Sequence, residues 1–133
     1  MGIGSAEEFR CLRLSENQDE YFRAAHEEAP IEVWREVCAR WPDLRVWVAQ
    51  NKTVPVDVLR ELSADPDPDV RSMVAQKRKL PLDIQLRMAK DPDSGVRGAL
   101  ANNGKLGDEV RGILLDDSEK FVREAAANRR GTG

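Results

Sequence analysis

Arginine recurs at an interval of 26 residues in this 133-residue chain, and a guanidinium group can bind either carboxylate or phosphate. The column consists of Arg45, Arg71, Arg97 and Arg123. Two interpretations are open: a ladder that binds a polyanion, or a repeated structural partner for aspartates in the adjoining turns. Those aspartates are Asp65, Asp67, Asp91 and Asp93. We favour the structural role, because the arginines keep phase with the Asp-Pro turns and a guanidinium suits fixed carboxylate geometry better than an ammonium group does.

A second set of cations could bind phosphate. Its members occupy equivalent positions of successive repeats and would form one basic ridge if the repeats stack: Lys52, Lys77, Arg78, Lys79, Lys105 and Arg129. The simpler explanation is the helix dipole, which favours cations at helix C-termini. The run QKRK at 76–79 exceeds what such capping needs, so phosphate contact by the basic ridge stays open.

All three tryptophans lie in the first repeat. Trp47 shares its column with Met73 and is expected to fill core space. Trp34 belongs to a column that turns polar in later repeats, so we expect it to be partly exposed, and Trp41 lies at a turn between helices. Tryptophan is a favoured anchor in binding hot spots, so Trp34 and Trp41 are candidate partner-binding residues. The alternative is that they cap the open end of the core.

Residues typical of catalysis or cofactor binding are scarce. Cys11 and Cys38 are too few and too far apart for a disulfide framework or a zinc site, and His26 is the single histidine. No nucleophile elbow, phosphate-binding glycine loop or paired-histidine motif is present. The acidic turns lack the spacing of a calcium loop and sit where helices should begin, as caps do. We therefore predict no enzyme, no cofactor and no metal, with an enzyme acting on nucleic acid as a distant alternative.

These residues are carried by an internal repeat. One phrase occurs four times, as LRVWVAQN at 44–51, VRSMVAQK at 70–77, VRGALANN at 96–103 and VREAAANR at 122–129. A second phrase, VPVDVLRELSADPDPD at 54–69, aligns with LPLDIQLRMAKDPDSG at 80–95, and a shortened copy, APIEVWREVCARWPD, precedes it at 29–43. Fixed spacing of this kind is the signature of a repeat architecture.

Each repeat predicts two short helices. In 80–103, the apolar residues Leu82, Ile84 and Met88 predict one buried helix face. The Asp-Pro-Asp turn that follows ends this helix and supplies the N-cap of the next one. Gly104 is available for a left-handed turn after the second helix. Helices this short are marginal alone and must stack on their neighbours. The prediction is an all-α solenoid of about four two-helix repeats with a 26-residue period and a degenerate N-terminal helix.

The domain organisation follows from the repeat. We expect a polar leader over 1–17, a single helical-repeat domain over 18–130 and a tail over 131–133. The net charge of −3 divides into −5 for residues 1–43 (five bases, ten acids) and +2 for residues 44–133 (sixteen bases, fourteen acids), which is not the strongly basic balance of a typical nucleic-acid-binding protein. With no long apolar run and no secretory signal at its start, the chain is expected to be cytoplasmic and away from membranes.

The phrase DPDPDVRSMVAQ together with the pattern xxPxDVLxxLA resembles the leucine-rich repeat variant family, a relative of the HEAT and armadillo solenoids. The resemblance covers about residues 29–129 and implies a right-handed superhelix of alternating α and 3₁₀ helices. One member of that family has an iron–sulfur cluster ahead of its repeats. Such a cluster needs about four thiolates, and this chain has two cysteines, so we do not expect it here.

The predicted function is a non-enzymatic helical-repeat scaffold that binds a protein or peptide partner on its solenoid surface. The alternative is a nucleic-acid-binding module that uses the basic ridge.

Overall fold

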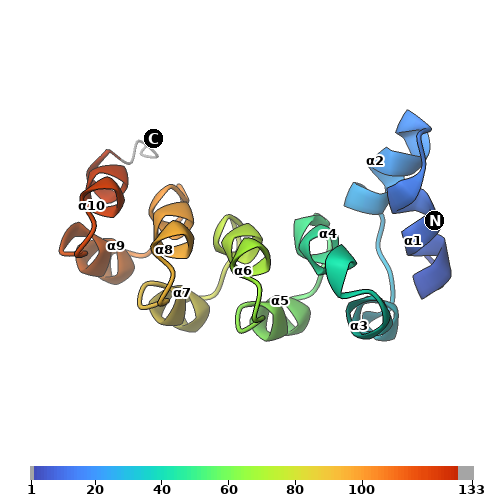
Figure 1. Cartoon of the computed structure of the whole chain (residues 1–133), viewed down its shortest axis with the longest axis horizontal. Coiled ribbons are helices and arrows are strands. Elements are labelled where there is room, and N and C mark those ends of the chain that lie inside the picture. Colours follow the sequence, from blue (N-terminus) through green and yellow to red (C-terminus); the bar gives the residue numbers. More distant parts are fainter. Residues whose placement is uncertain (1, 129–133) are drawn as a thin grey trace. The chain divides into compact units, whose positions relative to one another are not determined.

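The computed structural model describes residues 2–128, and all regular secondary structure within that range is helical. The elements, coloured along the chain in Figure 1, are α1 (Ala6–Leu14), α2 (Gln18–His26), α3 (Ile31–Arg40), η1 (Pro42–Leu44), α4 (Arg45–Gln50), α5 (Val56–Leu62), α6 (Pro68–Ala75), α7 (Leu82–Met88), α8 (Ser94–Ala101), α9 (Asp108–Leu115) and α10 (Lys120–Ala127). The order agrees with a helical-repeat fold.

Aspartates cap two of the helices that carry the arginine column, α6 and α8, whereas α10 begins after Glu119 without a side-chain cap. Asp67 accepts a hydrogen bond from the backbone N–H of Asp69 at 2.8 Å, at the start of α6. Asp93 accepts from the N–H groups of Gly95 and Val96 at 2.7 and 3.2 Å, at the start of α8. These contacts satisfy donors that a helix N-terminus otherwise leaves unpaired.

Three local expectations need correction. The arginine-bearing helices α6, α8 and α10 are α-helices, and η1, a single turn before α4, is the only 3₁₀ helix among residues 2–128. Leu82, expected in the buried face of α7, is 48% exposed because Ile84 and Met88 take the core positions. Gly104 does not adopt a positive φ, because the end of α8 is held by a side chain, described below, and not by a left-handed turn.

Contacts group the chain into two compact units that divide between Leu62 and Ser63. In the N-terminal unit, α1 packs against α2 and α3, although the sequence predicted only a polar leader there. Phe9 of α1 is fully buried, and its ring meets Trp34 of α3 edge to face, with centroids 5.2 Å apart. Helix α1 needs few apolar residues, because only its inner face (Ala6, Phe9 and Leu12) is buried.

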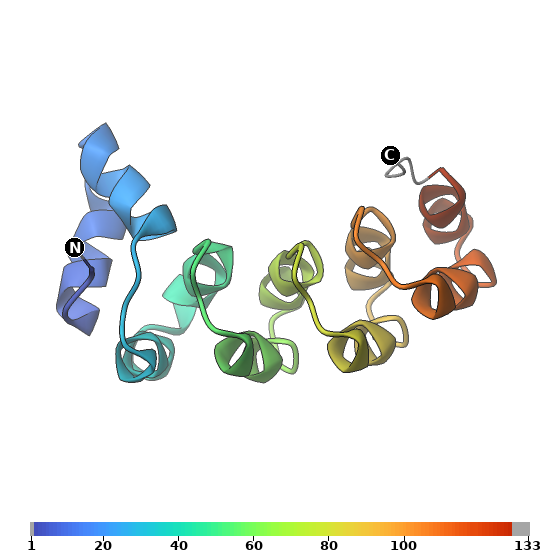
Figure 2. The same cartoon turned by 180° about the vertical axis from the view of Figure 1, so that it is seen from behind.

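In the C-terminal unit, helices form two layers. Helices α6, α8 and α10 lie in one layer, with α7 and α9 in the other, as both views in Figure 1 and Figure 2 show. Contacts α6–α8 and α8–α10 join the first layer, and contacts α7–α9 join the second. Apart from Met88, these buried residues of the unit are branched aliphatic ones: Val70, Val74, Ile84, Met88, Val96, Leu100, Val110, Leu114 and Val122. Each short helix thus buries its apolar face against its neighbours.

Candidate binding surfaces

Two arginines of the column in the C-terminal unit, Arg71 and Arg97, are bound to carboxylates of the following turn. Arg71 donates from Nε and Nη2 to Asp91 at 2.8 and 3.1 Å, and Arg97 donates in the same way to Asp117 at 2.7 and 3.3 Å. Both arginine side chains are only 13% exposed. Each also donates from Nη1 to a backbone carbonyl of its own turn, that of Asp65 or Asp91, at 2.7 Å. The guanidinium groups therefore join consecutive turns.

The other two arginines contact backbone carbonyls. Arg45 donates from Nε to Cys38 O at 2.8 Å, and Arg123 donates from Nη1 to Asp117 O at 2.8 Å. Around Asp117, burial raises the pKa of the carboxyl, but the hydrogen bonds from Arg97 and from the N–H of Glu119 outweigh burial and hold the pKa below its ordinary value of 3.8. A carboxylate in this setting stays ionised and paired, which is the geometry expected of a structural contact.

Asparagine side chains also connect neighbouring segments, and the sequence analysis missed them. Asn103 is buried; its Nδ2 donates to the carbonyls of Ala75 and Lys77 at 2.9 and 2.8 Å, and its Oδ1 accepts from the N–H of Lys105 at 2.8 Å. In the N-terminal unit, Asn51 donates in the same way to the carbonyls of Ala24 and Glu27. The signal was available, because the two asparagines lie 52 residues apart, twice the spacing of the arginine column.

The residues of the predicted basic ridge belong to both compact units. Lys77 is half-buried, whereas Arg78, Lys79 and Lys105 are exposed, and all four belong to the C-terminal unit. Lys52 is exposed in the N-terminal unit. Arg129 lies outside the described residues. Within the C-terminal unit, the hydrogen bonds of Asn103 bring the segment with Lys77 beside the segment with Lys105.

The two ends of the helices in the C-terminal unit carry opposite charge. Segments 76–81 and 102–107, which follow α6 and α8, contain four cations and no acid. Segments 63–67, 89–93 and 116–119, which precede α6, α8 and α10, contain one cation, Lys90, and seven acids: Asp65, Asp67, Asp91, Asp93, Asp116, Asp117 and Glu119. The hydrogen bonds of Arg71 and Arg97 join the acidic segments to one another, and those of Asn103 join the two basic segments. Each set of segments therefore forms one edge. We call these the basic edge and the acidic edge; an eight-residue helix of about 12 Å separates them.

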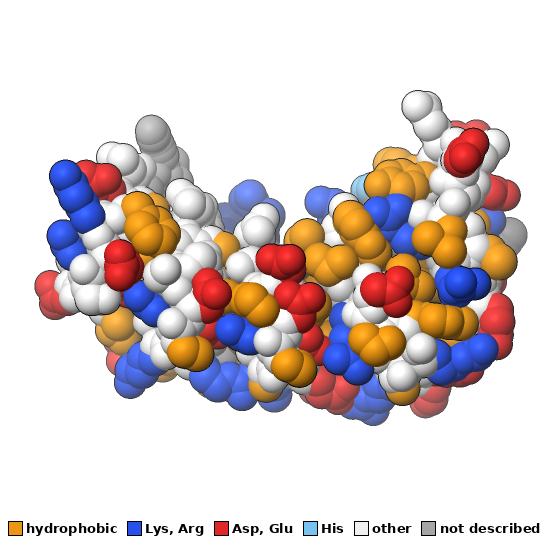
Figure 3. Space-filling view, viewed as in Figure 1, with side chains coloured by type: hydrophobic (Ala, Val, Ile, Leu, Met, Phe, Trp, Pro, Cys, Tyr) orange, Lys and Arg blue, Asp and Glu red, His pale blue; other side chains and the backbone are white. Residues whose placement is uncertain are grey.

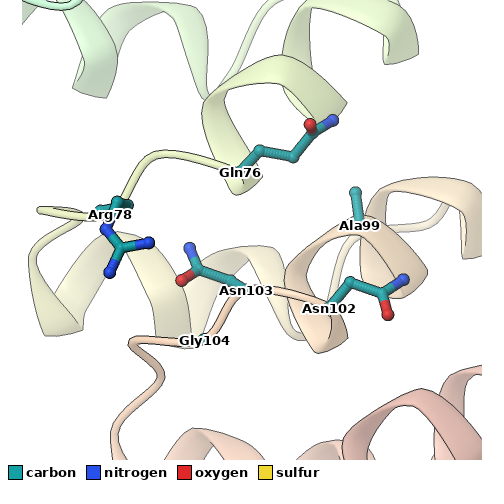
Figure 4. A pocket seen from close by; sticks show the side chains of 6 residues that line it. All are labelled: Gln76, Arg78, Ala99, Asn102, Asn103 and Gly104. Atoms are coloured by element: carbon teal, nitrogen blue, oxygen red, sulfur yellow. The ribbon is translucent and has the colours of Figure 1, made fainter. Parts of the chain in front are cut away.

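A shallow hollow of about 440 Å³ opens at the basic edge. It is lined by Gln76, Arg78, Ala99, Asn102, Asn103 and Gly104. Figure 4 shows Gln76 and Asn102 at the ends of two adjacent helices, with Ala99 near both and Asn103 between Asn102 and Arg78. The lining is therefore polar except for Ala99 and Gly104.

The tryptophans differ from expectation. Trp34 is fully buried, so the expected partial exposure is wrong; the leader covers it through Phe9, which sequence columns of the later repeats could not indicate. Trp41 is half-buried, with the guanidinium carbons of Arg40 and Arg10 at 4.4 and 5.3 Å from its ring centroid. Trp47 is also half-buried, so it does not lie wholly in the core.

Large exposed apolar side chains occur on the packed helices α1 and α2. Leu14, Tyr21 and Phe22 are 59%, 45% and 60% exposed. Phe22 stacks on His26 with ring centroids 3.8 Å apart, and in Figure 3 a hydrophobic cluster lies beside the single histidine over α2. Arg13 contacts both Tyr21 and Trp47, with its guanidinium carbon 4.4 and 3.6 Å from the two ring centroids. We call Leu14, Tyr21 and Phe22 the α2 patch.

Neither a metal-binding cluster nor a membrane-spanning helix occurs among residues 2–128. No group of three or more histidine, cysteine or acidic side chains converges there in a way that could hold a metal ion. No helix in the same range has the length and apolar character needed to cross a membrane.

Comparison with known proteins supports the repeat. The family model for the leucine rich repeat variant matches residues 42–67, which span η1, α4 and α5, and this confirms the resemblance to that HEAT-like helical-repeat family. No curated protein and no solved structure shows significant similarity to the chain.

Proposed function

We propose that this chain, with its leucine rich repeat variant unit, is a non-enzymatic scaffold that binds a protein partner through the α2 patch. The observation that carries the proposal is the exposure of Leu14, Tyr21 and Phe22 on two packed helices. Contiguous exposed apolar surface marks interaction sites on soluble proteins. Trp41, half-buried and in contact with the guanidinium groups of Arg10 and Arg40, is the remaining candidate from the tryptophan pair, because Trp34 has no exposed surface to offer.

The contacts of Tyr21 favour a preformed surface. Its ring lies against the Arg13 guanidinium, which in turn lies against Trp47. Cation–π contacts of this kind hold an aromatic side chain in place before a partner arrives. An anchor that is already ordered loses less conformational entropy on binding, so more of the contact energy appears as affinity.

A capture experiment with matched variants tests the α2 patch. The tagged chain, Phe22→Ser and Leu82→Ser are each incubated with a nuclease-treated lysate of the source cells. Leu82 is the control, because it is a similarly exposed apolar residue in the other unit. We expect a protein that the parent and Leu82→Ser retain and Phe22→Ser loses. Equal retention by all three, or retention that disappears with nuclease, would count against the proposal.

The same proposal covers the architecture of the scaffold: one right-handed solenoid domain over 18–130 with a 26-residue period. Its support is the recurrence of equivalent contacts, since Arg71–Asp91 and Arg97–Asp117 are separated by 26 residues at both partners. A solenoid presents extended surfaces along its length, which suits the binding of another chain.

The alternative function, nucleic-acid binding through the basic ridge, is favoured by the clustering of Lys77, Arg78, Lys79 and Lys105 at one edge. If it is correct, affinity should fall steeply with salt, because bound cations on DNA or RNA are released. Changing Lys77, Arg78 and Lys79 to Ala should then weaken binding across all sequences and flatten the salt dependence.

We expect only weak binding in that experiment, because residues 44–133 carry a net charge of just +2, from sixteen bases and fourteen acids. Fluorescence anisotropy at near-physiological salt measures it. An affinity tighter than about 1 μM, abolished by the triple substitution, would establish the alternative in place of the proposed function.

A further inference from the structure

We propose that the hollow at the basic edge of the C-terminal unit binds an extended acidic peptide, with Gln76 and Asn102 holding its main chain and Arg78 pairing with its carboxylates. This inference rests on the proposed function, since it assumes a binding scaffold, and it adds the chemistry of one ligand. It concerns a different unit from the α2 patch and can fail independently of it.

A column of carboxamides is the first observation. Gln50, Gln76, Asn102 and Asn128 follow one another at intervals of 26 residues, each at or just after the end of a second helix of its repeat. Core packing does not require this choice, because Gln76, Asn102 and Asn128 are exposed. A side chain that is both exposed and chemically uniform through the repeats is suited to a surface role.

The orientation of these carboxamides is fixed by their own helices. Gln76 donates from Nε2 to Ser72 O at 3.2 Å, and Asn102 donates from Nδ2 to Gly98 O at 3.1 Å. Each contact uses one N–H of the amide. The carbonyl oxygen and the second N–H remain for a ligand, and an acceptor beside a donor is what the N–H and C=O groups of a peptide main chain require.

The spacing of the two carboxamides suits an extended chain. Helices α6 and α8 pack directly on each other. Packed helices have axes about 8–10 Å apart, which is close to three residues of an extended chain at about 3.3 Å per residue. Ala99 leaves room between them, whereas the equivalent position of the preceding repeat holds Met73.

The positive charge of the basic edge and the lack of aromatic residues in the hollow favour an acidic peptide over a nucleic acid as its ligand. The basic edge contains Lys77, Arg78, Lys79 and Lys105 without an acid in the same segments, and Arg78 lines the hollow. None of the residues that line the hollow is aromatic. Single-stranded nucleic acids are usually held by bases stacked on aromatic rings, and the hollow offers no such ring.

The test uses a fluorescein-labelled, acetylated decapeptide of alternating Glu and Ser, which self-repulsion keeps extended. Anisotropy at near-physiological salt measures its binding to the full chain. The comparison ligands are the isosteric Gln-Ser decapeptide and ten-nucleotide oligo-dT. We expect the acidic peptide to bind at least about tenfold more tightly than either, because only it combines carboxylates with a main chain that two carboxamides can hold.

Variants separate main-chain recognition from general attraction of anions. The double substitution Gln76→Ala and Asn102→Ala leaves the charge unchanged and should lower the affinity for the acidic peptide about tenfold through lost hydrogen bonds. Arg78→Ala should lower this affinity to a similar degree. Ala99→Met should do the same, because it fills the hollow with the residue type that the preceding repeat has at this position. Lys90→Ala, which removes a charge from the acidic edge, is the control and should leave affinity within about twofold.

The outcomes are decisive in both directions. Absence of binding, equal or tighter binding of oligo-dT, or an acidic-peptide affinity indifferent to the double carboxamide substitution each overturns the inference. Phe22→Ser should bind the acidic peptide like the parent, because the α2 patch lies in the other unit. If the parent chain does not bind the acidic peptide but retains a protein partner through Phe22, this inference is disproved and the proposed function stands.

Discussion

Arg97 and Asp117 are almost entirely withdrawn from solvent, with side chains 13% and 6% exposed, and they share two hydrogen bonds. Arg97→Ala should therefore lower the free energy of unfolding by about 1–3 kcal/mol, because a buried carboxylate loses its charged partner. Arg71→Ala should behave alike through Asp91. Urea denaturation measures both effects.

The matched control for these variants is Arg35→Ala. Arg35 pairs with Glu61 at 2.6 Å, but both side chains are about half exposed. Solvent screens such pairs, so the control should change stability much less. Should Arg71→Ala and Arg97→Ala unfold like the parent and instead lose a ligand, the column would be a binding ladder.

The ionisation of Asp117 makes stability depend on pH. Its pKa in the folded chain lies below the ordinary value of 3.8, because the hydrogen bonds from Arg97 and Glu119 outweigh the cost of burial. A carboxyl with a depressed pKa stabilises the fold above about pH 4, and this contribution is lost as pH falls through the lower pKa that the group has in the folded state. Asp117→Asn should flatten that part of the stability–pH curve, measured by urea denaturation from pH 6 downwards. An unaltered curve would show that Arg97 does not hold this carboxylate ionised.

At the scale of the elements, the side chain of Asn103 joins the end of α6 and the segment after it to the segment that follows α8. Asn103→Ala removes three hydrogen bonds and leaves the carbonyls of Ala75 and Lys77 without this donor. We expect a loss of about 1–3 kcal/mol in the free energy of unfolding, because these groups are buried or nearly so.

The neighbouring residue provides the control for that prediction. Asn102 is exposed and hydrogen-bonds only within its own helix, to Gly98 O, so Asn102→Ala should be much milder in the same denaturation experiment. If the two variants were equally stable, the inter-segment role of Asn103 would be wrong.

At the scale of the whole molecule, short helices are stabilised by their neighbours. Deleting residues 106–133 removes α9 and α10, which contact α8, and exposes the buried face that includes Val96 and Leu100. The shortened chain should aggregate or unfold without cooperativity, because nearest-neighbour stacking stabilises each repeat. Thermal unfolding followed by circular dichroism, with light scattering, measures this. A soluble truncation that melts like the parent would argue against continuous stacking in this unit.

Charge is also organised at this scale. The sequence gives residues 44–133 a small net charge, yet the C-terminal unit separates its charges into a basic and an acidic edge. Alternating helix directions bring every second connecting segment to the same edge, so a repeat in sequence becomes a surface of one sign. The nearly neutral total conceals that separation.

The sequence by itself determined the local features of this protein. The positions of the short helices, the aspartate caps of α6 and α8 and the resemblance to the leucine rich repeat variant all follow from residue types at fixed spacing. Capping depends on atoms within three residues of the helix start, so no distant segment is needed to predict it.

Only the tertiary structure decided which side chains are covered. Trp34 is buried because Phe9, from a segment that reads as polar, packs on it, and Leu82 is exposed because Ile84 and Met88 face the core instead. Asn103 gains its partners from residues 26 and 28 positions earlier. Burial and hydrogen bonding of this kind depend on segments far apart in sequence, and a repeat pattern predicts that such segments meet without specifying which atoms touch.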